Sequence, residues 1–392
     1  MILRFEDCEL DLERFVLRRA GETVHVEPQV FDLIAFLARN AGSVVLKDAL
    51  VEAVWQGLAV SDATINARIS GARRALGDSG KEQRIIRTVP RKGFEFRPEV
   101  RMGDTAPPVD TVPSKASRVR YVASADGTPI AWAESGDGPV LIRASHWLSH
   151  LERDLSCPLW QPYIDRLSRY RRLLRYDLRG TGLSGRDARL DRLDDFVNDL
   201  EAVADASGAA TVDIFACSQG APVALAYAVR HPDRLRKLVI LGGYALGRVF
   251  RPPEPGAADE ETILGMIRAG WGQGNSAFVR AFGALFIPEA TREEIDSQIA
   301  TQAATIAPDR AVELRKTVDR FDVTGLLPDV RARTLVFHST GDAIHPISQG
   351  QRIAAGVPGA EFSRVDSPNH ALLPQEPEWE RVMRDMERFL TT

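Results

Sequence analysis

Residues 211–232, TVDIFACSQGAPVALAYAVRHP, contain the pattern that decides the fold of the larger part of this 392-residue chain. A short apolar, β-rich run at 211–215 leads into a turn of small residues at 216–220, and 222–229 reads as a buried helix. This order is the setting of a nucleophile elbow, in which the turn holds a serine, here Ser218, in a strained conformation with its hydroxyl outward. It also fits an ordinary strand–turn–helix connection in which Ser218 caps the helix.

Small residues on both sides of Ser218 favour the elbow, because the strand and helix backbones nearly touch at such a turn. Gly220 satisfies this need on the helix side. Ala216 stands where the G-x-S-x-G pattern has its first glycine, and a methyl group is the smallest possible departure from that pattern.

Polar residues that follow later strands predict the partners of this serine. A serine hydroxyl needs a base to accept its proton, and the base needs an acid to orient it. Asp342 directly follows one predicted strand and His370 follows the next, so we expect Ser218, Asp342 and His370 to form a catalytic triad. His338 and His345 compete for the role of base, but the first lies within a strand and the second lies just after the acid.

Catalysis by such a triad also needs two N–H donors for the negatively charged oxygen of the transition state. The backbone N–H of Gln219, at the start of the elbow helix, is the first predicted donor. The second should come from the turn after the apolar run 140–144, and we favour Trp147.

The chain from residue 119 onward alternates strands with helices, which predicts an α/β domain with a mostly parallel, doubly wound sheet covered by helices. Functional sites in such sheets lie beyond the carboxyl ends of the strands. The predicted strands are 120–124, 129–134, 140–144, 173–176, 211–215, 238–242, 334–337 and 361–365.

Residues 244–325 interrupt this alternation with helical apolar patterns and predict a helical cap. Its large aromatic residues can line a ligand pocket, but we expect at least half of them to form the core of the cap itself. These residues are Trp271, Phe278, Phe282 and Phe286.

Residues 1–100 predict a separate α+β domain with the order of a winged helix-turn-helix: short strands, helices at 30–39, 47–55 and 61–76, and a hairpin over 85–96. Residues 61–100 carry nine Lys or Arg against five Asp or Glu, a net +4, whereas residues 1–60 carry six against ten, a net −4. The positive excess therefore falls on the third helix and the hairpin, as a DNA-facing surface requires. A small α+β domain with a solvated basic helix is the alternative.

Two groups of side chains are predicted to contact double-stranded DNA. The first can reach base edges or phosphates in a major groove and consists of Thr64, Asn66 and Arg68. The second suits phosphates, from the end of the third helix or the tip of the hairpin, and consists of Arg73, Arg74, Arg91 and Lys92.

Composition limits the class of protein further. The net charge is −4, and three scattered cysteines give neither a disulfide framework nor a metal-ligand spacing. The N-terminus lacks the features of a signal peptide, and no apolar run approaches the ~18 residues of a membrane span. We expect a cytoplasmic protein without metal or cofactor, whose two domains are joined by a flexible linker, residues 101–118, rich in Pro, Ser and Thr.

The runs SDATINARISGARRALGD at 61–78 and RIIRTVPRKGFEF at 84–96 resemble the C-terminal DNA-binding domain of OmpR/PhoB-type response regulators, and the resemblance covers residues 1–100. No receiver domain precedes it, so we expect a signal other than phosphorylation of the familiar aspartate. Regulators of the CadC type carry a membrane helix after the same domain, and none is expected here. The resemblance implies binding to repeated half-sites as a homodimer.

Residues 119–392 resemble the α/β-hydrolase superfamily in the run DLRGTGLS at 177–184, the serine turn, Gly341-Asp342 and Asn369-His370. The resemblance implies an esterase, lactonase or carbon–carbon bond hydrolase, because the dehalogenase and epoxide-hydrolase branches use aspartate. Ser145-His146 replaces the family's common His-Gly pair, which affects the donor expected at Trp147. The run SHLE at 149–152 is similar to that of hydrolase domains fused to bacterial regulatory modules.

Together the two halves predict a DNA-binding transcriptional regulator whose second domain senses, and can hydrolyse, a small ester, lactone or other carbonyl ligand. Ligand binding would change operator affinity. A serine hydrolase with an accessory DNA-binding domain is the main alternative, and a receptor that keeps Ser218 only for binding is a third.

Overall fold

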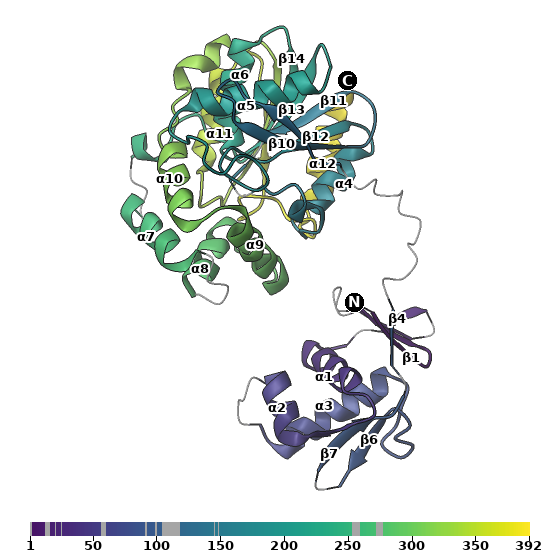
Figure 1. Ribbon diagram of the computed structural model, residues 1–392. Helices are drawn as coiled ribbons and strands as arrows, with labels where there is room; N and C mark the ends of the chain where they lie inside the picture. The colour runs from purple at the N-terminus through teal and green to yellow at the C-terminus, as the bar shows by residue number, and fades with distance from the viewer. Residues whose placement is uncertain are drawn as a thin grey trace. The chain divides into compact units, whose positions relative to one another are not determined.

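The chain divides into two units, Met1–Pro113 and Ser114–Thr392, in the computed structural model (Figure 1). The structure describes residues 2–11, 16–19, 21–24, 26–55, 60–90, 92–98, 100–103, 118–144, 146–147, 149–252, 259–271 and 277–392. Each unit has a hydrophobic core of its own.

A five-stranded sheet joins the first four strands of the first unit to its last described strand. Its strands, in spatial order, are β4 (Glu22–Val24), β3 (Val16–Arg19), β2 (Cys8–Asp11), β1 (Ile2–Phe5) and β8 (Arg101–Gly103). β8 pairs antiparallel with β1, with Ile2 opposite Gly103. The first unit therefore extends beyond residue 100, where the sequence placed the start of the linker. Residues 104–117 of the predicted linker, 101–118, lie outside the described residues.

Three helices and a small sheet complete this unit and confirm the predicted winged helix-turn-helix. The elements are α1 (Pro28–Arg39), β5 (Val44–Leu46), α2 (Lys47–Trp55), α3 (Asp62–Ala75), β6 (Ile86–Val89) and β7 (Gly93–Phe96). α3 begins where the Ser61 hydroxyl accepts the N–H of Thr64, and the chain leaves it at Gly77, whose φ of +70° favours glycine.

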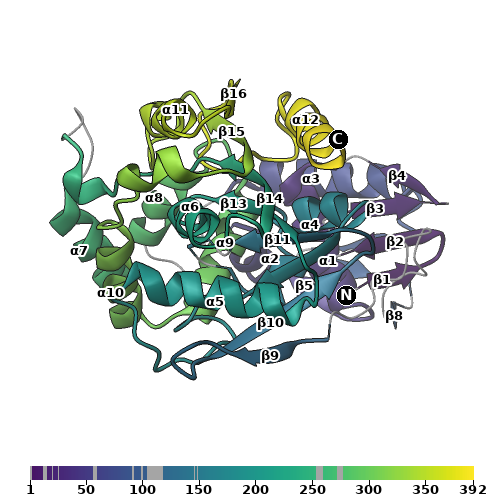
Figure 2. The ribbon, with the colours of Figure 1, turned by 90° about the horizontal axis from the view of Figure 1, so that it is seen from above.

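An eight-stranded sheet forms the centre of the second unit and confirms the predicted α/β class. Its strands, in spatial order, are β16 (Glu361–Val365), β15 (Arg333–Ser339), β14 (Leu235–Leu241), β13 (Val212–Cys217), β11 (Val140–Ala144), β12 (Arg172–Tyr176), β10 (Pro129–Ser135) and β9 (Arg120–Ala123). The six strands from β16 to β12 are parallel, and β10 and β9 are antiparallel additions at one edge (Figure 2).

Helices cover this sheet, and its central strands β11 and β13 are therefore buried along their whole length. The covering helices are α4 (Gln161–Ser168), α5 (Leu193–Ala206), α6 (Gly220–Arg230), α11 (Ile347–Gly356) and α12 (Trp379–Thr391). Within the predicted cap, between β14 and β15, the described residues form four α-helices (Figure 1): α7 (Glu260–Gly270), α8 (Ala277–Phe286), α9 (Arg292–Thr305) and α10 (Pro308–Val318).

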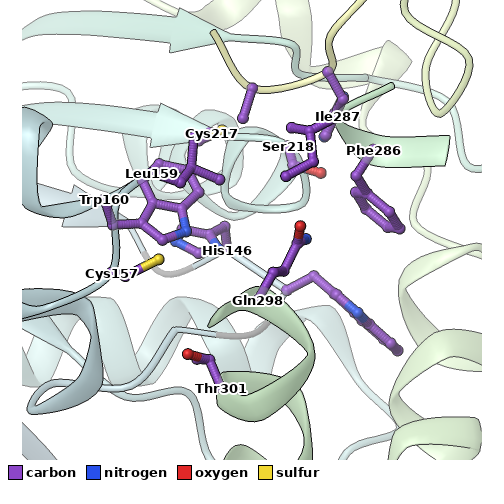
Figure 3. Close-up of a pocket in the computed structure, with 13 residues that line it drawn as sticks. His146, Cys157, Leu159, Trp160, Cys217, Ser218, Phe286, Ile287, Gln298 and Thr301 are labelled. Carbon is purple, nitrogen blue, oxygen red and sulfur yellow. The ribbon is translucent and has the colours of Figure 1, made fainter. Parts of the chain in front are cut away.

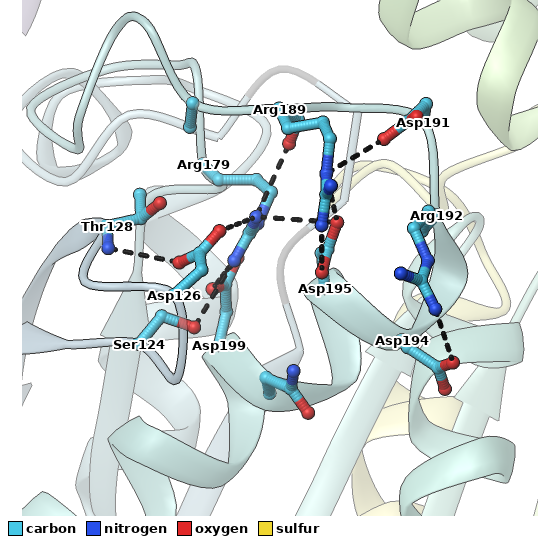
Figure 4. A network of polar contacts seen from close by, with 12 residues as sticks. Ser124, Asp126, Thr128, Arg179, Arg189, Asp191, Arg192, Asp194, Asp195 and Asp199 are labelled. Carbon is cyan, nitrogen blue, oxygen red and sulfur yellow. Dashed lines mark hydrogen bonds and ion pairs between the residues drawn. The ribbon is translucent and has the colours of Figure 1, made fainter.

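Buried charges hold the loop that follows β12. The guanidinium of Arg179 donates two hydrogen bonds to Asp199 of α5, at 2.7 and 2.6 Å, and one of 2.9 Å to Asp126 in the β9–β10 turn (Figure 4). Arg179 and Asp199 are both fully buried. The β9–β10 hairpin and α5 are thereby fixed to the loop after β12, one of the loops at the carboxyl edge of the sheet.

We expect Asp199→Ala to destabilise the second unit by about 3–5 kcal/mol, because it leaves the Arg179 guanidinium buried without its main counter-charge. Unfolding in urea, followed by tryptophan fluorescence, measures the loss. The matched control is Glu260→Ala, which breaks an exposed pair with Arg320 and should cost at most about 1 kcal/mol. Equal losses in the two variants would contradict this account of the loop.

Candidate functional site

Ser218 lies in the strained turn that the sequence predicts. It follows the last residue of β13, and its φ of +54° falls in the left-handed region that a residue with a Cβ rarely adopts. The neighbouring strand holds this turn, since the Ser218 N–H donates to the carbonyl of Leu241 at 3.1 Å. α6 begins two residues later at Gly220. The expected strand–turn–helix geometry is therefore present at the predicted serine.

The structure brings the predicted acid and base together. Nδ1 of His370 donates to Oδ2 of Asp342 at 2.7 Å, and both side chains are buried. The other oxygen of Asp342 accepts the backbone N–H groups of Ile344 and His345 at 2.8 and 2.9 Å, which fixes the carboxylate. A Cβ on Gly242, at the end of β14, would lie 3.2 Å from Cε1 of His370, so glycine leaves room for the imidazole.

The Ser218 hydroxyl contacts a different histidine from the one predicted. Its Oγ lies 3.4 Å from Nε2 of His345, whereas Nε2 of His370 has no hydrogen-bond partner among the described residues. Ser218 and His370 nevertheless line the same cavity. His345 was not predicted at the site because it lies just after the acid in sequence. The turn closed by Asp342, which accepts the backbone N–H of His345, returns His345 to the serine, and no sequence pattern gave the path of this loop.

The surroundings of His345 determine which of its nitrogens carries the hydrogen. Nη2 of Arg251 lies 3.2 Å from Nδ1 of His345, and a guanidinium can only donate. Nδ1 is therefore the acceptor, and the hydrogen of the neutral imidazole is on Nε2, facing Ser218. Burial, together with the charge of Arg251, lowers the pKa of His345 well below its ordinary value. His345 is thus a donor to Ser218 and cannot take its proton, which leaves that role to His370.

A small cavity of about 40 Å³ opens beside Ser218. Apolar side chains form most of its wall. The Gln298 carboxamide points from α9 toward the part of the cavity where Ser218 lies (Figure 3). The lining residues are His146, Trp147, Cys157, Leu159, Trp160, Cys217, Ser218, Phe286, Ile287, Gln298, Thr301, His370 and Ala371. His146 stacks on Trp160 at 4.0 Å, and burial lowers its pKa well below the usual value.

The cap aromatics divide between the cavity and the packing of the cap. Phe286 lines the cavity. Trp271 instead packs edge-on against Trp147, with ring centroids 6.0 Å apart, and its indole N–H donates to the carbonyl of Ile306 at 2.8 Å. The side chains of Phe278 and Phe282 lie outside the described residues.

The two predicted oxyanion donors lie close to Ser218 or to the cavity. Gln219 is the residue before α6, where the first N–H groups of a helix have no acceptor within the helix. Trp147 is buried in the cavity wall, and its neighbours Ser145 and Leu148 lie outside the described residues. Both donors remain predictions.

One predicted DNA contact is excluded by burial. The Arg73 side chain lies inside the first unit, where its guanidinium donates to the carbonyl of Ile86 at 3.0 and 2.7 Å and to the hydroxyl of Thr88 at 2.8 Å. It ties α3 to the first strand of the wing hairpin and does not face solvent. The prediction that Arg73 contacts phosphate is therefore withdrawn.

The exposed face of α3 differs from the predicted one. Arg68 is half-buried, forms an ion pair with Glu27 and donates to Gln29 at 3.1 Å, and Thr64 is also half-buried. The exposed residues that share a face of α3 are Ala63, Asn66, Ala67, Ser70 and Arg74. Their small side chains would let the helix backbone come close to a groove. Lys92 is exposed at the hairpin, and Arg91 lies outside the described residues.

Comparison with known proteins identifies the families of both units. The family "Transcriptional regulatory protein, C terminal" matches residues 21–96, and the family "alpha/beta hydrolase fold" matches residues 152–286. The putative carbamate hydrolase RutD of Caulobacter segnis is 30% identical over 230 residues, which cover 57% of this chain and 83% of that protein. The chain belongs to the α/β-hydrolase family.

The N-terminal unit of this α/β hydrolase has a different relative. It is 31% identical over 81 residues to the transcriptional activator CadC of Escherichia coli, covering 20% of this chain and 16% of CadC.

The enol-lactonase from Burkholderia xenovorans LB400 shares the hydrolase fold, with a TM-score of 0.55 and 19% identity over 70% of this chain and 100% of that one. The chain thus joins an OmpR/PhoB-type DNA-binding domain to an α/β-hydrolase domain, as the sequence predicted.

Two further observations concern membrane-spanning helices and metal-binding groups. In the part of the chain that the structure describes, no helix is both long enough and apolar enough to cross a membrane. The same residues contain no group of three or more His, Cys, Asp or Glu side chains arranged to hold a metal ion.

Neighbouring arginines on α3 should give opposite phenotypes. Arg73→Ala should lower the free energy of unfolding of the first unit by about 1–3 kcal/mol, because buried acceptors lose their donor. Arg74→Ala should leave the free energy of unfolding unchanged and weaken binding to DNA of any sequence. The slope of log K for DNA binding against log salt concentration should become less steep by about one. Thermal unfolding and titration of fluorescent DNA at several salt concentrations measure both effects. The reverse assignment of phenotypes would contradict the buried position of Arg73.

Proposed function

We propose that this chain is a transcriptional regulator whose α/β-hydrolase domain binds and can hydrolyse a small carbonyl compound, and that ligand binding changes the affinity of the winged domain for DNA. One observation carries the proposal. A serine in a strained elbow shares a cavity with an imidazole oriented by Asp342, in a chain that also contains a DNA-binding domain.

The chemistry of the proposed site follows from three groups. Ser218 Oγ attacks the ligand carbonyl as Nε2 of His370 takes its proton, and Asp342 stabilises the resulting imidazolium. Backbone N–H groups of Gln219 and Trp147 would stabilise the oxyanion. His370 then returns the proton to the leaving group, and water releases the acyl group from Ser218 by the same steps.

The walls of the cavity indicate the kind of ligand. Trp147, Trp160 and Phe286 favour a compact apolar or aromatic body, carried by an ester, lactone, thioester or ketone. Oε1 of Gln298 is buried and accepts no hydrogen bond from the described residues. A buried acceptor of this kind is costly unless the ligand supplies a donor, so we propose a ligand with an O–H or N–H group.

Regulation requires that the ligand bind two states of the protein with different affinity, since equal binding would shift nothing. We propose that these states differ in their affinity for DNA and that the protein binds repeated half-sites as a homodimer. Hydrolysis of the ligand would make the signal self-limiting.

Two assays on the purified full chain test the proposal together. The wild type should hydrolyse 4-nitrophenyl acetate and should retain DNA from its own promoter region. Ser218→Ala should lower the hydrolysis rate by more than about a thousandfold and still retain DNA. Turnover without any DNA retention would favour a hydrolase with an accessory domain, and retention without turnover would favour a receptor that uses Ser218 only for binding.

The proposed role of Gln298 is tested with a matched pair of substrates. The wild type should prefer 4-nitrophenyl 3-hydroxybutyrate to 4-nitrophenyl butyrate, because only the first offers a donor to Oε1. Gln298→Leu should reduce this preference in kcat/KM by about tenfold. The rate with plain butyrate, which makes no such hydrogen bond, is the internal control. An unchanged preference would remove Gln298 from ligand recognition.

A further inference from the structure

The nucleophile and its proposed base are not hydrogen-bonded to each other. Nε2 of His370 has no partner among the described side chains, while the Ser218 hydroxyl is held by Nε2 of His345 at 3.4 Å. Attack on a ligand needs a hydrogen bond from the serine O–H to Nε2 of His370, and this bond is absent here. The contact with His345 therefore belongs to a resting state.

The His345 ring is fixed from several sides. Its backbone N–H donates to Asp342 at 2.9 Å and its carbonyl accepts from Nε2 of His338 at 2.8 Å. The ring packs against Tyr244, with centroids 4.4 Å apart, and Nδ1 accepts from Arg251 at 3.2 Å. His345 is only 4% exposed, so water does not compete for these hydrogen bonds. A donor N–H is thus held beside Ser218.

Arg251 connects this arrangement to the segment that leads to the cap. Its Nε donates to the carbonyl of Leu246 at 2.7 Å, and its guanidinium lies 5.2 Å from the centre of the Tyr244 ring. Arg251 follows β14 and precedes the cap helix α7 in sequence. Displacement of the Arg251 side chain on ligand binding would remove the donor to Nδ1, so that the hydrogen of His345 could move from Nε2 to Nδ1.

We propose that His345 is a positioning residue that latches the Ser218 hydroxyl away from His370, with the direction of its hydrogen bond set by Arg251. The inference rests on the proposed function and adds its regulation. In the latched position the Ser218 hydroxyl makes no hydrogen bond to His370, so the serine must rotate before its proton can be taken. Attack on a bound ligand is thereby slowed, which suits a receptor.

Labelling of the full chain by a fluorophosphonate probe tests the latch, because Ser218 Oγ displaces fluoride from phosphorus and passes its proton to His370. His345→Met removes the donor and should accelerate labelling by about tenfold. His345→Gln keeps an N–H near the position of Nε2 and should label within about twofold of the wild type. Ser218→Ala should not label at all.

Arg251→Met provides a second route to the same result should the His345 variants not fold. It should also accelerate labelling, and the double variant with His345→Met should be no faster than His345→Met alone, because Arg251 acts on Ser218 only through His345. Labelling of His345→Met and Arg251→Met at or below the wild-type rate would overturn the latch. Absence of labelling in the wild type and every variant would overturn the proposed hydrolase site, and the latch with it.

Discussion

The hydrogen bond of 2.7 Å from Nδ1 of His370 to Asp342 is the interaction on which the candidate site depends. Because Nδ1 donates to the carboxylate, Nε2 is left as the nitrogen that can accept a proton from Ser218. The bond is possible because β15 and β16 are neighbouring parallel strands, so the loops that carry the two residues leave the same edge of the sheet. Gly242, at the end of the adjacent β14, leaves the space that the ring occupies.

Two histidines near one serine are given opposite chemical roles by their neighbours. A carboxylate faces Nδ1 of His370 and makes that ring an acceptor at Nε2, whereas a guanidinium faces Nδ1 of His345 and makes that ring a donor. The difference lies in the partner at the far nitrogen, which comes from Asp342 in one case and from Arg251 in the other. The same domain can thus combine a reactive serine with a contact that restrains it.

The sequence predicted the order of elements well, because alternation of apolar runs and the serine turn depend on local pattern and burial. It also predicted Asp342 and His370, since strand ends mark the edge of the sheet. It could not predict that His345 returns to Ser218 or that Arg251 fixes its tautomer, because both depend on the paths of loops. Arg73 was misplaced for a related reason: basic residues are usually exposed, and its acceptors, Ile86 and Thr88, lie on a hairpin distant in sequence.

The tautomers of the two histidines give the most direct test of this account. Long-range proton–nitrogen correlation spectra of the chain with ¹⁵N-labelled histidine distinguish a ring protonated at Nδ1 from one protonated at Nε2, with signals assigned by their loss in His345→Gln and His370→Gln. The account predicts a hydrogen on Nδ1 of His370 and on Nε2 of His345 at neutral pH. A hydrogen on Nε2 of His370, or an unprotonated Nε2 on His345, would contradict it.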